Sequence, residues 1–430
     1  MAANIVSLAA GMIFSESTKI ECEHERTQER IDEINELNGA YSKFLQAAEL
    51  AGVCGGVFLA CTWNDADGYP KFNVVPANCG LPEWRGGKLF RVKLWSIAKE
   101  DENGSVWRTE ETYTEDGHIK TRLLKGDKNN LGAEVGLKSI DETAHILPDT
   151  NSGTDMLLAV YVPNMLPNRE RPHERFGRSD YDGLYGLFDE LDEMYSAMQR
   201  ETRLTKTTVI VPAEYLRKRD AIFGLENSAC KVDQWIYSNN TGAFTALDID
   251  SGQTSSPITV INPELRAEQR IALCDELVRR IWQCAGYSPQ SAGIDISGSA
   301  ESGTALSVRE RATIRTTETK KTHWWHALHH LMRALLKLDS VVFRSGVDAD
   351  ADITIELPSN AQPDISQMAE ILEQLERAGA ISTEMKIELH HPDWDEEKRA
   401  AELERILNET SVVSGNINRI LDDPDGGGEE

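Results

Sequence analysis

The sequence predicts an α+β protein in which helices alternate with two separate groups of short strands. Three observations support this fold class. Residues 57–124 contain short β-type runs joined by Asn-Gly and Asp-Gly dipeptides, residues 207–263 form a second β-rich stretch between two amphipathic helical segments, and a long helical run begins near residue 304. The 430 residues are enough for about two to four packing units with a sizeable core.

Acidic residues outnumber basic ones, since 71 Asp and Glu stand against 45 Lys and Arg and the net charge is −26. This balance excludes a protein that grips nucleic acid over its whole surface, because phosphate binding needs clustered Lys and Arg. An acidic wall can still surround nucleic acid, repel its phosphates and leave it mobile. The same charge is also typical of an ordinary soluble protein, so both interpretations stay open at this point.

The cysteines and the apolar segments exclude several other classes of protein. The seven cysteines form no C-x-x-C pair, so neither a zinc ribbon nor a redox motif is indicated. The apolar start, Met1–Ser15, lacks a basic segment and a clear cleavage site, so we expect no secretory signal. No run of about 20 apolar residues is present, and we expect no contact with a membrane.

The first part of the chain has the pattern of helices followed by a sheet. A short helix is expected over Ile5–Ile13 and a longer one over Glu25–Leu50, because apolar residues recur there at helical spacing. Five β-type runs follow, at Val57–Trp63, Lys71–Pro76, Phe90–Lys99, Ser105–Tyr113 and Ile119–Leu124. The dipeptides Asn103-Gly104 and Asp116-Gly117 predict type I′ hairpin turns. We therefore expect one antiparallel meander over residues 57–124.

The middle of the chain predicts an antiparallel helix pair with a β-rich tip. A helix from about Asp182 to Leu204 has one apolar stripe, and a second is expected over Glu264–Ala285. The first of these helices also carries four acidic residues, Asp189, Glu190, Asp192 and Glu193. Between the helices, β-type runs occur at Thr207–Val211, Trp235–Tyr237 and Phe244–Ile249.

The last third of the chain is predicted to be mainly helical. A Gly- and Ser-rich segment, Tyr287–Gly303, precedes a long helix over Thr304–Leu338, whose first half is so polar that we expect oligomerisation to cover it. A strand is expected at Ile353–Leu357. The signals in the remainder are a helix start at Asp364, a stop at Gly379, a cap at Ser382, a capping box of Asp393 and Glu396 and a disordered tail over Asp422–Glu430.

Four histidines, His323, His326, His329 and His330, make the most enzyme-like cluster, because helical His pairs can bind zinc. No H-E-x-x-H motif is present, however, and no acidic residue lies within the cluster to act as base or ligand. A polar stripe on a helix explains these residues better. We therefore expect no metal, no cofactor and no enzymatic activity here.

Two further polar segments lack the motifs of nucleotide or DNA sites. Residues 293–303 contain neither G-K-[ST] nor G-x-G-x-x-G, which favours a flexible linker over a phosphate-binding loop. A run of basic residues follows, comprising Arg309, Arg311, Arg315, Lys320 and Lys321. If the segment is helical, these side chains form two small separate patches. Ion pairs between subunits explain these patches as well as phosphate contacts do.

Four short sequence motifs occur in a specific order along the chain. They lie at residues 4–14, at residues 131–137, at Gly177–Leu184 with Phe188–Asp192, and at Ser302–Leu306. Together they resemble the portal protein family of tailed bacteriophages, in the branch found in siphophages of Gram-positive hosts. The most specific match is to the family motif G-x-S-D-Y-x-G-L, which starts the first stem helix and corresponds here to Gly177, Ser179, Asp180, Gly183 and Leu184.

The resemblance implies a portal-type α+β fold with an α/β wing, a two-helix stem, a β-rich clip, a long helix and a helical crown. The expected boundaries are 1–178 for the wing, 179–204 and 264–286 for the stem helices, 205–263 for the clip, 287–303 for the tunnel loop, 304–345 for the long wing helix and 346–430 for the crown with its acidic tail. Candidate channel-lining residues are Asp189, Glu190, Asp192 and Glu193. Candidate tunnel-loop residues are Ser291, Gly293, Asp295, Gly298, Ser299, Glu301 and Gly303.

The function that the resemblance implies is a homo-oligomeric ring, usually of twelve subunits, at one capsid vertex. Double-stranded DNA would pass through its channel during genome packaging and ejection. The clip would bind the terminase motor and later the head–tail adaptor, while other surfaces would contact the major capsid protein and the scaffold. Such a protein is expected in the virion, and in the host cytoplasm during assembly.

Besides a non-viral scaffold built from the same helices, two other functions remain open from the sequence. One is another ring component of a phage head, although adaptors are typically much shorter than this chain. The other is a metal-dependent hydrolase at the histidine cluster, for which stoichiometric zinc or manganese in the purified protein would be the sign.

Overall fold

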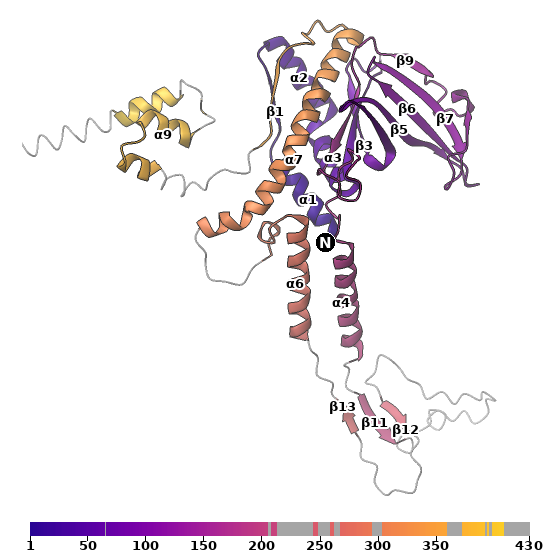
Figure 1. Ribbon diagram of the computed structural model, residues 1–430, viewed down its shortest axis with the longest axis vertical. Helices are drawn as coiled ribbons and strands as arrows, with labels where there is room; N and C mark the ends of the chain where they lie inside the picture. Colours follow the sequence, from indigo (N-terminus) through magenta and orange to yellow (C-terminus); the bar gives the residue numbers. More distant parts are fainter. Residues whose placement is uncertain are drawn as a thin grey trace, which may run out of the picture. The chain divides into compact units, whose positions relative to one another are not determined.

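The structure is a computed structural model in which the chain divides into two compact units. One unit comprises residues 1–297 and 309–358, and the other comprises residues 298–308 and 359–430. The residues described are 1–64, 66–204, 208–212, 244–247, 259–261, 267–294, 303–358, 372–391, 394 and 398–407. Helices and sheets both contribute to the larger unit, as the sequence predicted (Figure 1). None of the described helices is long and apolar enough to cross a membrane.

A three-stranded antiparallel sheet lies at the centre of the larger unit. Its order is β10 (Ala159–Pro163), β2 (Gly56–Thr62) and β3 (Lys71–Pro76). Strand β2 is buried along nearly its whole length, and its core cluster also includes side chains of α1 (Ala2–Ile13) and α7 (Gly303–Leu338). The central strand therefore joins segments from both ends of the unit in one core.

The second sheet has six strands and forms a meander in its first four. Its path is β4 (Gly80–Arg85), β5 (Lys88–Glu100), β6 (Val106–Thr114), β7 (His118–Gly126) and β8 (Ala133–Val135), with β9 (Asp149–Asn151) also paired to β7. The expected single meander over residues 57–124 is therefore wrong. Strand β2 pairs with β3 on one edge and with the distant β10 on the other, because the almost wholly apolar β2 needs neighbours on both edges and cover on both faces.

The two hairpin turns of the second sheet occur where the dipeptides predicted them, but their type differs. Gly104 and Gly117 have φ values of 79° and 74°, whereas no positive φ occurs at Asn103 or Asp116. A type I′ turn needs positive φ at both central residues, so that prediction is wrong. The Gly104 N–H donates to the Asp101 carbonyl, as in a type I turn that ends in a left-handed glycine.

The expected helix over Glu25–Leu50 is two helices. They are α2 (Glu25–Asn38) and α3 (Ala40–Cys54), separated by Gly39 at φ 58°. The buried Asn38 side chain causes the break, since its Nδ2 donates to the carbonyls of Ile34 and Pro70 while its Oδ1 accepts from the Phe72 N–H. Leu37 and Tyr41, apolar residues on either side of the break, are 48% and 40% exposed.

The far end of α7 is tied back to the N-terminal helices by a buried ion pair. Helix α7 runs into a π-helical turn, Asp339–Phe343, in which Asp339 is fully buried. The Arg30 guanidinium of α2 lies 2.7 Å from the Asp339 carboxylate. Beyond this turn, β14 (Ile353–Glu356) pairs antiparallel with β1 (Lys19–Cys22), so the two ends of the unit meet.

The helix pair and the small sheet between its members occupy the middle of the chain. The helices are α4 (Tyr185–Leu204) and α6 (Ala267–Ala285). Between them, β11 (Thr208–Pro212) pairs in parallel with β12 (Phe244–Leu247) and antiparallel with β13 (Thr259–Ile261). The predicted strand Trp235–Tyr237 lies outside the described residues.

The smaller unit contains short helices. The Ser382 hydroxyl accepts a hydrogen bond from the Met385 N–H and caps α9 (Thr383–His390), as the sequence predicted. Gly379 has φ 63° just after the helical residues 372–377, which confirms the predicted stop. Residues 398–407 are also helical, whereas the predicted signals at Asp364, at Asp393 with Glu396 and in the tail lie outside the described residues.

Two glycines of the helical region are expected to respond in opposite ways to the same substitution. Gly11 lies inside α1 with open space around its Cα, so Gly11→Ala should raise the free energy of unfolding by about 0.5–1 kcal/mol. Gly39→Ala should lower it by about 1–2 kcal/mol, because Gly39 is left-handed although no atom would clash. Urea unfolding of both variants tests this, and a gain in stability for Gly39→Ala would contradict the helix break.

Candidate functional site at the root of the helix pair

The helices α4 and α6 pack side by side in antiparallel fashion (Figure 1). Leu184, just before α4, and Leu191 of α4 share a hydrophobic cluster with Leu277 and Ile281 of α6, and Ile5 of α1 joins it. Near the other end of the pair, the Arg270 Nε lies 2.6 Å from a Glu201 carboxylate oxygen. The apolar stripes that the sequence predicted therefore face each other.

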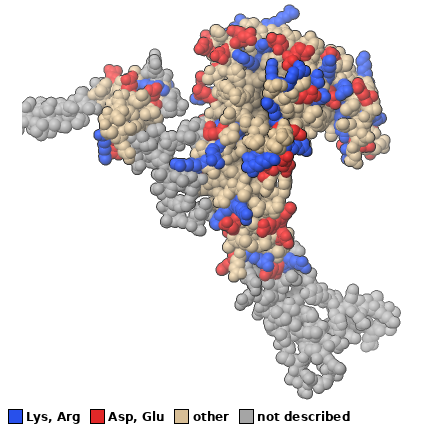
Figure 2. Space-filling view, in the orientation of Figure 1, with Lys and Arg blue, Asp and Glu red and all other residues tan. Residues whose placement is uncertain are grey.

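The outward surface of the pair combines charges with exposed apolar side chains. The predicted channel residues Asp189, Glu190, Asp192 and Glu193 are all exposed on α4. Figure 2 shows acidic and basic side chains gathered along this part of the molecule. Four large apolar side chains are also at least 43% exposed here, namely Tyr185, Tyr195, Ile271 and Leu273. A surface of this kind is typical of contacts with another protein.

The motif that precedes α4 fastens the helix pair to the end of α3. The Ser179 Oγ and the Asp180 N–H both donate to the carbonyl of Gly52. Gly177 approaches Gly55 so closely that a Cβ on Gly177 would lie 2.1 Å from the Gly55 carbonyl oxygen. The motif then ends in Gly183, at φ 77°, and Leu184, which is 1% exposed. The five motif residues thus set the position at which α4 begins.

Asp180 forms the centre of this root through a buried ion pair with α7. The Lys320 Nζ lies 2.7 Å from each Asp180 carboxylate oxygen, and the two side chains are 1% and 3% exposed. The Asn164 Nδ2 donates to the same carboxylate over 2.8 Å. Burial lowers the pKa of the Lys320 ammonium, and the Asp180 carboxylate opposes this shift.

Sequence reasoning missed this role of Lys320. The basic run was expected to form surface patches, but Lys320 is 1% exposed and Lys321 is 5% exposed. Lysine is almost never fully buried unless it is paired, and a partner 140 positions away leaves no local signal. In the sequence, only the specific motif around Asp180 indicated that this carboxylate has a structural role.

The polar half of α7 is partly covered by the segment that follows α6. Thr313 and Thr317 are fully buried. The Thr313 hydroxyl accepts from the Ser288 N–H over 2.8 Å, and the Thr316 hydroxyl donates to the Gly286 carbonyl over 2.8 Å. The expectation that oligomerisation alone covers this polar surface is therefore wrong.

Of the predicted tunnel loop, residues 287–303, the structure describes residues 287–294 and 303. Ser291 lies in a short 3-10 turn, Gln290–Ala292, and its hydroxyl is 3.0 Å from that of Thr313, while Gly293 follows the turn at φ 73°. Gly303 is already the first residue of α7. The remaining loop candidates lie outside the described residues; they are Asp295, Gly298, Ser299 and Glu301.

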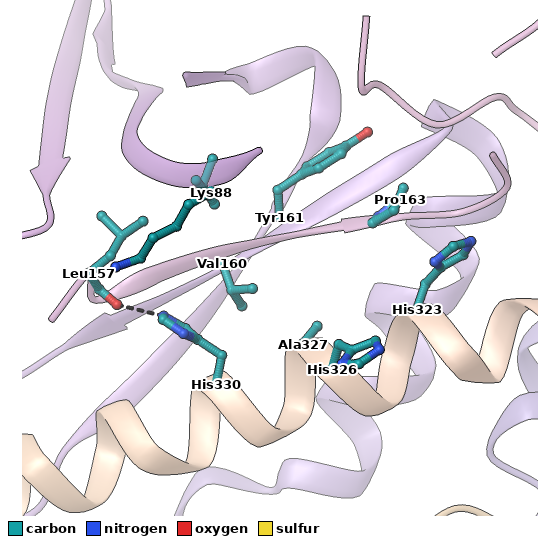
Figure 3. Close-up of a pocket in the computed structure, with 10 residues that line it drawn as sticks. Lys88, Leu157, Val160, Tyr161, Pro163, His323, His326, Ala327 and His330 are labelled. Atoms are coloured by element: carbon teal, nitrogen blue, oxygen red, sulfur yellow. Dashed lines mark hydrogen bonds between the residues drawn. The ribbon is translucent and has the colours of Figure 1, made fainter. Parts of the chain in front are cut away.

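Three of the four predicted histidines of α7 line a pocket of about 290 Å³ against β10, and His329 is not among its lining residues. Figure 3 shows His323, His326 and His330 on α7, and the His330 Nε2 bonds to the Leu157 carbonyl over 2.8 Å. Burial lowers the pKa of His330, and Lys88 and His329 lower it further, against the effect of the Leu157 carbonyl. Among the described residues, no group of three or more His, Cys, Asp or Glu side chains could hold a metal ion.

The fold and the root define a helix pair anchored in an α+β domain, a scaffold built to hold two helices in a fixed position. Residues 1–414 match the family described as "Phage portal protein, SPP1 Gp6-like". The chain therefore belongs to this family of phage portal proteins, as its motifs indicated. It is a structural component of phage particles, the portal ring at the capsid vertex.

Similar solved structures come from gene transfer agent (GTA) particles. The neck of a native GTA particle, computed with C12 symmetry, is 11% identical with a TM-score of 0.47, over 90% of this chain and 88% of that one. The virion of a native GTA particle is 13% identical with a TM-score of 0.46, over the same shares. Among curated proteins, no match to the chain is found.

Removal of the Lys320 charge should destabilise the larger unit strongly. We expect Lys320→Met to lower its free energy of unfolding by about 3–5 kcal/mol, because Asp180 stays buried without its cation. A matched control on the same helix is Lys337→Met, which breaks an ion pair with the 85% exposed Asp155 and should cost at most about 1 kcal/mol. Equal losses for the two variants in urea unfolding would contradict the assignment.

Acidification should destabilise the larger unit through His330. Its pKa lies below the ordinary value of 6.5 in the folded protein, so its contribution to stability is complete above pH 6.5 and is lost as the pH falls from there through the lowered pKa. His330→Gln should therefore flatten the dependence of the unfolding free energy on pH below 6.5. The unfolding free energy is measured with denaturant between pH 7 and about pH 5. If it falls with pH as steeply in His330→Gln as in the wild type, the prediction is wrong.

Proposed function

We propose that about twelve copies of this chain close into a ring in which the α4–α6 pairs stand side by side around the DNA channel. The observation that carries this proposal is the outward surface of the pair. Its inner face is filled within one chain, yet Tyr195, Ile271 and Leu273 remain exposed beside charged residues. A second copy that lies against these side chains would remove them from water.

The acidic residues of α4 suit the channel side of such a ring. Asp189, Glu190, Asp192 and Glu193 are exposed and lie on one helix, and each copy carries a net charge of −26. A wall of the same charge as the phosphates repels double-stranded DNA and lets it move in either direction, during packaging and during ejection. The energy for packaging comes from a separate terminase motor in this proposal.

The segments beyond the helix pair supply the remaining contacts. The small sheet β11–β13, within residues 205–263, is the clip in this proposal and offers strand edges to the terminase motor and then to the head–tail adaptor. The wing, residues 1–178, contacts the major capsid protein and the scaffold. The protein performs no catalysis, and it resides in the virion after assembly in the host cytoplasm.

Ring formation should depend on the exposed apolar side chains of the helix pair. We expect light scattering at micromolar concentration to give a mass several times that of the 47.9 kDa chain. Ile271→Glu and Tyr195→Glu should each lower this mass, because a charge at a contact between copies is costly to desolvate. Glu190→Gln is the matched control on an exposed position and should leave the mass unchanged. A monomeric wild-type chain at all salt concentrations would contradict the proposal.

The channel assignment predicts a defect that leaves rings intact. Glu190→Lys with Glu193→Lys should preserve ring mass and impair DNA packaging, because a basic collar attaches to phosphates and its effect weakens as salt rises. Glu190→Gln with Glu193→Gln serves as the neutral control and should have a much smaller effect. If the lysine variant packages DNA at the wild-type rate, these residues do not line the channel.

A further inference from the structure

The segment Gly286–Ala292, called the latch below, is held on α7 largely by threonine side chains. The Ser288 N–H donates to the Thr313 hydroxyl, and the Thr316 hydroxyl donates to the Gly286 carbonyl. The Ser291 hydroxyl lies 3.0 Å from that of Thr313. Each such bond to a side chain contributes about 1 kcal/mol, so the hydrogen bonds alone hold the latch at one position on α7 only weakly.

A further threonine on this face of α7, Thr317, has no hydrogen-bond partner in this arrangement. The Thr317 side chain is fully buried, and its hydroxyl makes no hydrogen bond with any described residue. It lies four residues, or about one helical turn, beyond Thr313. A buried hydroxyl without a partner costs about 1–3 kcal/mol, and such a group calls for a reason.

The side chain of Tyr287, which precedes Ser288 in the latch, also makes no hydrogen bond with the described residues. Tyr287 is 1% exposed, its hydroxyl has no partner among the described residues, and its ring lies 5.6 Å from the Lys320 Nζ. It packs edge-on against Trp282 at 6.5 Å between ring centres. This packing partner lies in α6, so the Tyr287 side chain adds no hydrogen bond between the latch and α7. The latch also begins and ends beside glycines with positive φ, Gly286 and Gly293.

We propose that the latch has two registers on α7, which differ by about one helical turn. In the observed register the Ser288 N–H bonds to Thr313, and in the second it bonds to the vacant Thr317 hydroxyl. One turn of helix is about 5.4 Å. Beyond the latch, Gly293 and Ile294 are the last described residues before α7 begins at Gly303. As a step of DNA passage, the device rests on the proposed channel function.

Hydrogen exchange on assembled rings tests the two registers without any DNA. The amide exchange of a peptide that covers residues 286–292 is measured by mass spectrometry in wild type, Thr313→Val, Thr317→Val and the double variant. We expect both single variants to keep nearly wild-type protection, because one hydroxyl remains for Ser288. The double variant should exchange about tenfold faster, the factor for one hydrogen bond of ordinary net strength.

The pattern among the four proteins decides between the alternatives. If Thr313→Val alone exchanges as fast as the double variant, Thr317 cannot replace Thr313 and the second register does not exist. Thr322→Val, at an exposed position of the same helix, controls for the general effect of valine and should leave the exchange unchanged. A Thr322→Val variant that accelerates exchange as much as the double variant would also overturn the proposal.

A packaging assay then tests whether the change of register matters for DNA. Thr317→Val removes an unpartnered hydroxyl, so rings should form normally while packaging slows by several-fold. If wild-type rings package DNA and Thr317→Val rings do so at the same rate, the second register has no role in passage. If wild-type rings pass no DNA at all, the channel function fails, and the exchange result still decides whether two registers exist.

Discussion

The buried ion pair between Lys320 and Asp180 is the contact on which the arrangement of the helix pair depends. It joins α7 to the motif that precedes α4, and Asn164, just after β10, bonds to the same carboxylate. Two fully paired charges in the interior are costly to separate, because neither can return to water without opening the core. The base of α4 is therefore fixed in the α+β domain, while the surface of the pair is left for other contacts.

A consequence is that α7 serves two different neighbours along its length. Its apolar half, with Trp324 and Leu328, belongs to the central core under β2 and β10. Its polar half binds the latch through Thr313 and Thr316. Lys320 lies between these halves, so the same helix connects the central core, the root of the pair and the start of the segment that follows α6.

The sequence predicted those parts whose signals are local. The stripes of α4 and α6, the hairpins around Gly104 and Gly117 and the cap at Ser382 all depend on neighbours a few residues away. The pairing of β2 with β10 depends on residues about 100 positions apart, and the break at Gly39 on contacts of Asn38 with Pro70 and Phe72. Lys320 and the buried threonines were misjudged for the same reason, since polar residues are mostly exposed and their partners here are remote.

Negative-stain electron microscopy of the purified chain tests most directly whether its copies form a closed ring around a central hole. Class averages viewed along the axis should show a ring with a stain-filled centre, whose subunits repeat about twelve times. An interface that fails to close would instead produce open filaments. Filaments would contradict the ring and with it the channel. Single chains, seen at a protein concentration well above the one needed for assembly, would contradict them as well.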